Sequence, residues 1–191
     1  DTAYKDAQFT RTIASIVIGG KQPLVLDVLE VQASNDSQFD LPIHYQGQLI
    51  RSNVEKIAYT NTIKALGDKN GYQHLWLRAK GKTSNDIIQV TWLNDNGTFY
   101  THSGLNSANT ELLFTQLGAN DPDFNLRNEH GFIRRVSDKK QHQFISVLEP
   151  HGEYNPSKEY TLVAESRVTN LNHTQRDELV FVELEIVLLV D

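Results

Sequence analysis

Short stretches in which apolar and polar residues alternate run along the whole chain, with clusters of Gly, Asn, Asp and Pro between them. Alternation with period two is typical of β-strands that bury one face, because successive side chains point to opposite sides of a sheet. No window keeps the apolar stripe of a helix over three turns. The pattern predicts strands over residues 12–18, 23–31, 39–46, 72–79, 87–93, 98–102, 111–117, 131–136, 143–149, 159–168 and 178–190.

Polar turn residues separate these segments at intervals that favour antiparallel pairing. Residues 19–22, Gly-Gly-Lys-Gln, predict a hairpin, and residues 94–97, which end in Asn-Gly, are the strongest turn signal in the chain. Pro42 lies inside a predicted strand, so we expect that strand to lie at an edge or to contain a bulge. The expected fold is all-β, an antiparallel β-sandwich of two stacked sheets.

The chain shows no internal repeat, low-complexity tract or linker, so residues 1–191 are expected to form a single domain. It contains no methionine. We therefore expect a segment cut from a longer parent chain and truncated at both ends. Its 18 Lys and Arg against 24 Asp and Glu give a formal net charge of −6, which argues against nucleic acid or an anionic membrane as partner. No apolar run reaches the length of a membrane span.

Cysteine is absent, which excludes disulfides, thiolate metal sites and a cysteine nucleophile. No histidine pair has the H-x-H or H-x-x-x-H spacing of a metal site, and no G-x-S-x-G motif is present. No metal site is therefore predicted. The histidines are His44, His74, His102, His130, His142, His151 and His173.

Two loops are dense in turn-forming and polar residues: residues 118–127, GANDPDFNLR, and residues 149–156, EPHGEYNP. Such loops can be rigid connections between two sheets. They can also form a ligand-facing rim, in which Arg127, His151 and Tyr154 would be the substrate-binding residues. Both interpretations can hold for different residues of one loop.

Basic residues crowd into the stretch from residue 127 to residue 140. In one interpretation they form a solvated hairpin, and in the other they capture carboxylates, for which the arginine fork is suited. The residues are Arg127, Arg134, Arg135, Lys139 and Lys140.

Four strings together resemble the C-terminal β-domain of polysaccharide lyase family 17, the oligoalginate lyases of the heparinase II/III-like group. The resemblance covers most of the chain from residue 24 to about residue 165, in the family's order. It implies a parent chain in which a helical (α/α) toroid precedes the β-domain, with substrate in the cleft between them. The strings are FDLPIHYQGQLI (39–50), IKALGDKNGYQHLW (63–76), FTQLGANDPDFNLR (114–127) and FISVLEPHGEYNP (144–156).

The resemblance implies β-elimination at a uronate. The carboxylate must be neutralised by hydrogen bonding before a base removes the C5 proton, and an acid must protonate the leaving O4 oxygen. Tyrosine and histidine serve in such lyases, and the main ones belong mostly to the toroid, which this chain lacks. Tyr4 is the only candidate here for the family's cleft-facing tyrosine. The alternative is that Tyr4 is an aromatic anchor that packs a loose terminus.

One position departs from the family. The family usually reads T-I-A-H-N-T where residues 12–17 read TIASIV, so Ser15 stands at the expected histidine. In related heparinase-type enzymes a histidine near this point helps to bind a structural zinc. Serine is a poor zinc ligand, so no zinc and no other cofactor is expected.

The sequence thus predicts the β-domain of an enzyme that cleaves oligoalginate by β-elimination, secreted or periplasmic in a bacterium. The expected partners are an anionic uronate oligosaccharide and the missing toroid. Without the toroid we expect the segment alone to be inactive. The alternative is a non-catalytic carbohydrate-binding or structural module, which Ser15 favours.

Overall fold

The computed structural model describes residues 6–19, 22–118, 126–177 and 179–188, and these are almost entirely β-structure. No helix suited in length and apolarity to crossing a bilayer occurs among them. The described elements are β1 (Ala7–Ile16), β2 (Leu24–Tyr45), β3 (Gln48–Ser52), β4 (Lys56–Ala65), the 3₁₀ turn η1 (Tyr72–His74), β5 (Leu75–Lys82), β6 (Ile87–Leu93), β7 (Thr98–Leu105), β8 (Glu111–Gly118), β9 (Leu126–Asn155), β10 (Tyr160–Leu162), β11 (Val168–Arg176) and β12 (Leu179–Ile186).

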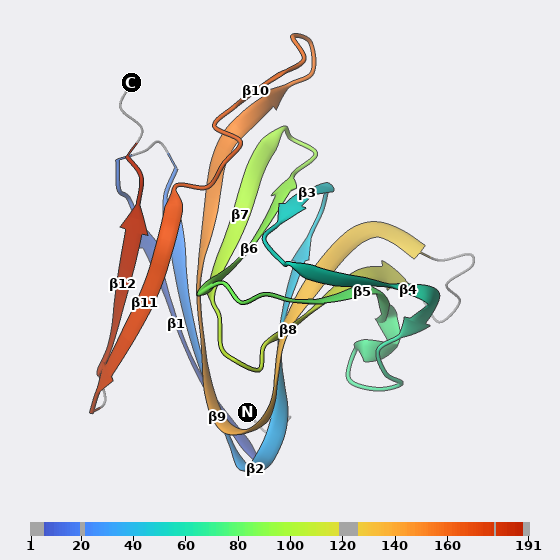
Figure 1. Ribbon diagram of the computed structural model, residues 1–191, viewed down its shortest axis with the longest axis vertical. Coiled ribbons are helices and arrows are strands. Elements are labelled where there is room, and N and C mark those ends of the chain that lie inside the picture. The colour runs from blue at the N-terminus through green and yellow to red at the C-terminus, as the bar shows by residue number, and fades with distance from the viewer. Residues whose placement is uncertain (1–5, 20–21, 119–125, 178, 189–191) are drawn as a thin grey trace.

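Strand β9 organises the larger sheet. It pairs with β2 along both halves, from Val25↔Leu148 at one end to Tyr45↔His130 at the other. Its opposite edge pairs with β8 in the first half and with β7 in the second. The sheet therefore divides into two arms, β8–β5–β4 and β7–β6–β3, while β1 pairs with the far side of β2 (Figure 1).

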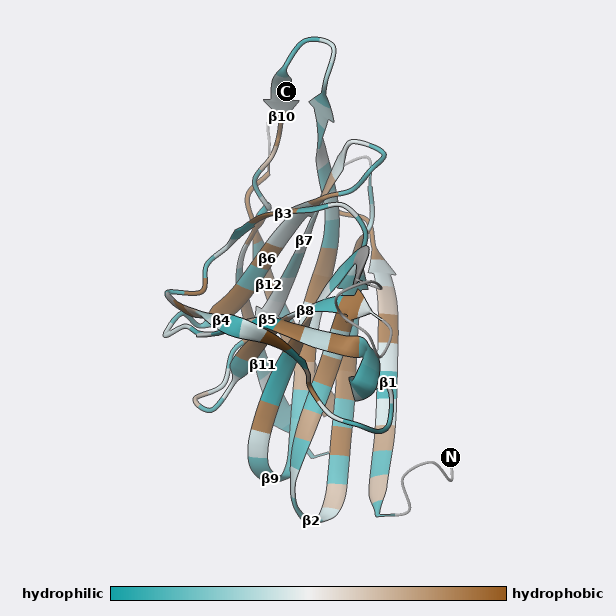
Figure 2. Cartoon of the chain, turned by 90° about the vertical axis from the view of Figure 1, so that its right-hand side faces the viewer, coloured by the Kyte–Doolittle hydropathy of each residue, from teal (hydrophilic) through white to brown (hydrophobic). Residues whose placement is uncertain are grey.

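The two arms enclose the main core. Its buried side chains come from both arms and from the strands that join them, as expected where one sheet curls and packs against itself. Apolar and polar bands alternate along β2 and β9 (Figure 2). The core cluster comprises Tyr45, Val54, Ala79, Ile88, Val90, Trp92, Leu112, Phe114 and Phe132.

The β11–β12 hairpin forms a second sheet, and it packs against the larger one. Leu171 of β11 is fully buried together with Leu24 of β2 and Val147 of β9, and the apolar side chains of β12 pack around them. The all-β prediction, an antiparallel sandwich of stacked sheets, is confirmed.

Several predicted strand limits were wrong. Residues 23–31 and 39–46 belong to one strand, β2, and residues 131–136 and 143–149 belong to one strand, β9. Polar residues interrupt the apolar pattern in both, but pairing continues across register shifts between Gln32 and Phe39. Asp138, with φ of 57°, lies at the corresponding irregularity of β9.

Other segments were misassigned for a related reason. Strands β3 and β4 were missed because their described side chains are mostly exposed, so no apolar alternation marks them. Within the predicted strand 159–168, Tyr160–Leu162 form β10 and Val168 begins β11, and between them Val163 has a φ of 50°. The β1–β2 hairpin is confirmed, and so is the edge position of Pro42, which lies beyond the part of β2 that pairs with β1.

Candidate functional site

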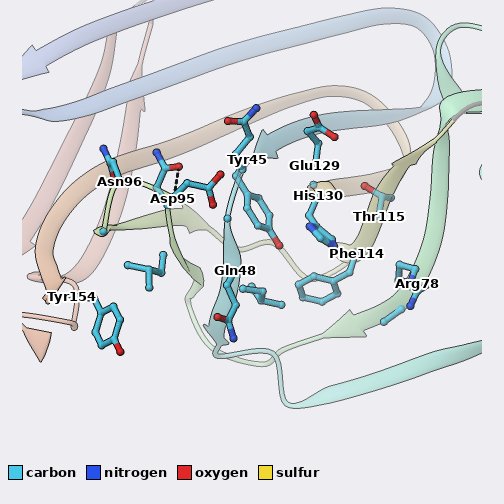
Figure 3. Close-up of a pocket in the computed structure, with 18 of the residues that line it drawn as sticks. Tyr45, Gln48, Arg78, Asp95, Asn96, Phe114, Thr115, Glu129, His130 and Tyr154 are labelled. Atoms are coloured by element: carbon cyan, nitrogen blue, oxygen red, sulfur yellow. Dashed lines mark hydrogen bonds between the residues drawn. The ribbon is translucent and has the colours of Figure 1, made fainter. Parts of the chain in front are cut away.

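A pocket of about 1100 Å³ opens between the ends of the two arms (Figure 3). Both ends of β9 contribute to it, because the strand spans the sheet from Glu129 on one arm to Tyr154 on the other. We call it the aromatic pocket. Its labelled lining residues are Tyr45, Gln48, Arg78, Asp95, Asn96, Phe114, Thr115, Glu129, His130 and Tyr154.

Two lining residues of the aromatic pocket, Tyr45 and His130, belong to a stack of rings. Tyr45 stacks on Trp92, with ring centroids 5.0 Å apart, and on His130, at 6.1 Å. Trp92 stacks in turn on Tyr100 at 5.8 Å. Trp92 and Tyr100 are not among the described lining residues, so this part of the stack supports the pocket wall from behind.

The turn between β6 and β7 supplies another side of the pocket. The sequence predicts this turn at Asn94–Gly97, and the structure confirms it: Gly97 has a φ of 83° and its amide donates to the Asn94 carbonyl at 2.9 Å. The Gly97 carbonyl accepts from the amide of Tyr154 at 2.8 Å. The turn thereby fixes the end of β9 that carries Tyr154 against the pocket rim, so residues 149–155, expected to be a loop, are extended.

The charge around the aromatic pocket is mixed. Arg78 is the cationic side chain among the described lining residues, and Asp95 and Glu129 are the acidic ones. Amide groups such as Gln48 and Asn96 provide uncharged donors and acceptors. The described lining therefore favours a hydroxyl-rich ligand, with room for one carboxylate at Arg78.

Tyr45 is unsuited to remove a proton at neutral pH. Burial raises the pKa of its phenol to about 12, which keeps the hydroxyl protonated. A protonated phenol can still donate a hydrogen bond. Tyr45 thus offers the pocket a hydrogen-bond donor and not a base.

His151 lies under the surface, 5% exposed. Its Nδ1 is 2.8 Å from the Val163 carbonyl, which can only accept, so Nδ1 carries the proton. Nε2 then accepts from the Thr101 hydroxyl at 2.8 Å. The hydroxyl oxygen of Thr101 lies 2.8 Å from that of Thr91. Burial lowers the pKa of His151 and favours this neutral ring. Contact with substrate, as the sequence suggested, would require one of these bonds to break.

The other predicted site residues are distributed differently. Tyr154 lines the aromatic pocket, in line with a ligand-facing rim. Arg127 lies in β9, but its side chain is outside the described residues, as are Tyr4 and most of the loop 118–127. The roles predicted for these residues, substrate binding for Arg127, His151 and Tyr154 and catalysis for Tyr4, stay predictions.

Ser15 lies on β1 with an exposed side chain, in register with Val25 of β2. Among the described residues, no group of three or more His, Asp or Glu side chains is arranged to hold a metal ion. That no zinc is bound stays a prediction.

The basic stretch does not form a single patch in its described part. Arg135 binds Asp40 through two hydrogen bonds, from Nε at 2.8 Å and from Nη2 at 2.7 Å. It does capture a carboxylate, but one from its own domain. The side chain of its neighbour Arg134 points to the opposite face of the strand and is 1% exposed. Its guanidinium donates to the carbonyls of Leu105 and Ile145.

Several polar groups buried within the sheets were not predicted from the sequence. His102 is 4% exposed with neither ring nitrogen hydrogen-bonded, and burial, with Arg134 nearby, lowers its pKa to about 3. Glu149 is fully buried and pairs with Arg167 at 2.6 Å. Each partner lies far away in sequence, so no local motif marks these contacts.

Comparison with known proteins relates the chain to part of two larger enzymes. It is 40% identical over 187 residues to a protein named alginate lyase from Stenotrophomonas maltophilia (strain K279a). It is 39% identical over 189 residues to an exo-oligoalginate lyase from Saccharophagus degradans (strain 2-40). Each match covers 96% of this chain, and the chain spans 25% and 26% of the length of the two relatives. No protein-family model matches. The chain is therefore homologous to about a quarter of each of two alginate lyases.

Proposed function

We propose that this chain is the β-domain of an oligoalginate lyase of polysaccharide lyase family 17, in the heparinase II/III-like group. The observation that carries the proposal is the 40% identity to an alginate lyase over 96% of the chain. The four family strings and the all-β fold support it. The substrate would be an anionic uronate oligosaccharide, cleaved by β-elimination in the parent enzyme.

In this proposal the aromatic pocket faces the missing helical toroid. Its rim carries exposed apolar side chains, Leu49, Ile57 and the 79% exposed Tyr59, which a second domain would cover. The pocket would contribute stacking and hydrogen bonds to the sugar, and the toroid would contribute the acid–base groups. The parent enzyme would act in the periplasm or outside a bacterial cell, as the family resemblance implies.

The test is the ultraviolet absorbance of the unsaturated uronate product. The 191-residue chain incubated with oligoalginate is expected to give no signal above buffer, and the complete parent protein is expected to give a steady increase. Turnover by the chain alone would overturn the proposal that the toroid contributes the acid–base groups. An inactive parent that still folds would overturn the lyase assignment.

The second candidate is a non-catalytic carbohydrate-binding or structural module. One observation on the described pocket favours it. The stacked Tyr45 keeps its hydroxyl protonated, so this phenol suits binding and not proton removal. An inactive parent chain that nevertheless retains uronate oligosaccharides on an affinity column would select this alternative.

A further inference from the structure

Arg78 lines the aromatic pocket although strand alternation alone would not place it there. In a regular strand, the side chains of Arg78 and Ala79 would point to opposite faces of the sheet. Both residues nevertheless line the aromatic pocket, and Ala79 also belongs to the core cluster enclosed by the two arms. The backbone of β5 must therefore depart from the regular pleat at this point.

A β-bulge at Arg78 explains this placement. Leu77 of β5 pairs with Thr115 of β8, and the next pair joins Ala79 to Phe114. Two steps along β5 thus correspond to one step along β8, which leaves Arg78 as the extra residue. Bulges are frequent beside binding sites, because they turn a side chain away from the direction that the pleat would give it. Here the bulge brings the Arg78 side chain to the same pocket as its neighbour.

Strand β4 supports the bulge from the other side of β5. The register between β4 and β5 is interrupted at the same place, between Tyr59 and Lys64, and no described pair includes Arg78. The Thr60 hydroxyl lies 3.1 Å from the carbonyl oxygens of both Leu77 and Arg78, to which it donates. The bulge is therefore held by a side-chain hydrogen bond in the sheet, and this fixes the point from which the arginine extends.

The guanidinium of Arg78 is available to a ligand. The residue is exposed, and with the described residues its side chain forms no ion pair and no hydrogen bond. Two neighbouring cations differ in this respect. Lys80 of the same strand pairs with Glu111 at 3.8 Å, and Arg135 of β9 pairs with Asp40 at 2.7 Å. The charge of Arg78 is therefore left for a partner from outside the described residues.

The acidic lining residues favour the Arg78 end of the pocket for an anion. Asp95 lies in the turn between β6 and β7, on the opposite side of the pocket from Arg78 (Figure 3). Glu129 lines the pocket from β9 and forms no ion pair with Arg78. Because like charges repel, an acidic sugar would place its carboxylate at Arg78 and its hydroxyls near amides such as Gln48 and Asn96. The guanidinium fork can bind a carboxylate through two parallel hydrogen bonds.

We propose that Arg78 makes the aromatic pocket specific for uronates, because its guanidinium binds the carboxylate of one sugar residue held in the pocket. The bulge in β5 positions the guanidinium for this contact. The inference deepens the proposed function and rests on it for the choice of a uronate among acidic sugars. In this role Arg78 discriminates between charged and neutral saccharides and takes no part in proton transfer.

The experiment compares two trisaccharides that differ at the carboxyl groups, a uronate trisaccharide and its carboxyl-reduced, uncharged form. Each is titrated calorimetrically into the 191-residue chain. The uronate form should bind about tenfold more tightly, the equivalent of about 1.4 kcal/mol. Arg78→Gln should lose this preference by weakening the uronate form alone, and its affinity for the reduced form should equal that of the wild type. Arg78→Lys should keep part of the preference, because an ammonium retains the charge without the fork.

Lys80→Gln is the matched control. It removes one positive charge from the same strand, at a residue outside the described pocket lining, and it should keep the wild-type preference. A melting temperature equal to that of the wild type shows that Arg78→Gln is folded. The inference is overturned if the chain binds neither trisaccharide or binds both equally. It is also overturned if Arg78→Gln keeps the preference for the uronate form, or if Lys80→Gln loses that preference to the same extent.

Failure of this inference can be told apart from failure of the proposed function. If the complete protein releases unsaturated uronate from alginate while Arg78→Gln binds both trisaccharides as the wild type does, the lyase assignment stands and the role of Arg78 is wrong. If the preference for the uronate form depends on Arg78 while the complete protein releases no product, the lyase assignment is wrong and the role of Arg78 stands.

Discussion

Two buried charged side chains on the same strand, β9, differ in the partners that compensate their charge. Glu149 is fully buried and accepts three hydrogen bonds, from the Ser166 hydroxyl at 2.6 Å and from the amide and Nε of Arg167 at 2.9 and 2.6 Å. Arg134 is equally buried, but within the described residues it has no carboxylate partner and its Nε is unpaired. The two side chains are therefore equally buried, but only Glu149 has a partner of opposite charge.

The difference follows from what surrounds each charge. Arg167 also reaches the carbonyls of Ile18 and Gly19, both at 3.3 Å, so the Glu149 pair joins β9 to the segment before β11 and to the end of the β1–β2 hairpin. Arg134 lies over the ring of Phe144 at 5.5 Å and close to His102. Burial lowers the pKa of Arg134 to about 10, so it stays charged at neutral pH. The first charge connects segments, and the second is only partly compensated.

The largest expected effect is at the paired charge. Arg167→Met should leave Glu149 buried without its counter-ion and lower the free energy of unfolding by about 3–5 kcal/mol. Denaturant unfolding of the 191-residue chain measures it. The control is Arg51→Met, which breaks the exposed pair with Glu165 and should cost less than about 1 kcal/mol. Equal losses in the two variants would contradict a special role for the buried pair.

The next effect is acid destabilisation through His102. Its pKa is about 3 in the folded chain and 6.5 for a free histidine, so below pH 6.5 the unfolded chain binds a proton that the folded chain does not. Stability is therefore lost as pH falls, by about 2 kcal/mol between pH 7 and pH 5 from this group alone. His102→Leu should flatten the pH dependence by that amount. A variant with the wild-type pH profile would show that folding does not lower the pKa of His102.

Structural features that depend on one or two neighbouring residues could be predicted from the sequence, and those that depend on distant residues could not. The Asn-Gly turn at residues 94–97 and the edge position of Pro42 follow from backbone restrictions of one or two residues, and both were predicted. The continuity of β2 and β9 was not, because long-range pairing carries them through polar stretches that break the apolar pattern. The β-propensity of single residues does not predict such long-range pairing.

The same limit applies to the sites. Tyr154 was singled out from residues 149–156, which were expected to form a loop and instead extend β9, and it lines the aromatic pocket. Its role in substrate binding stays a prediction. The stack of Tyr45 on His130 joins residues 85 positions apart, so it depends on the pairing of β2 with β9. Arg134 and Arg135 are adjacent in sequence, but the strand alternation sends one inward and the other to Asp40.

A smaller loss is expected in the hydrogen-bonded chain at His151. Thr101→Val keeps the shape of the side chain but removes the hydroxyl that bonds to Nε2 of His151. The buried nitrogen would then lack a partner, at a cost of about 1–2 kcal/mol. Thr161→Val, at an exposed position of β10, is the matched control and should change stability by less than about 0.5 kcal/mol. An unchanged free energy of unfolding in Thr101→Val would show that the bond between Thr101 and Nε2 contributes no net stability.

The smallest effect is expected at the unpaired charge, and it tests the comparison directly. Arg134→Met removes a buried cation whose desolvation is only partly offset, and it keeps most of the side-chain volume. The carbonyls of Leu105 and Ile145 lose a donor, which costs stability, while release of the buried charge restores some. These two contributions oppose each other, so unfolding free energy should change by less than about 1.5 kcal/mol. Removing Arg134 should also relieve the charge beside His102 and raise its pKa. A loss as large as that of Arg167→Met would mean that Arg134 is as well compensated as Glu149, and the contrast between the two halves of β9 would disappear.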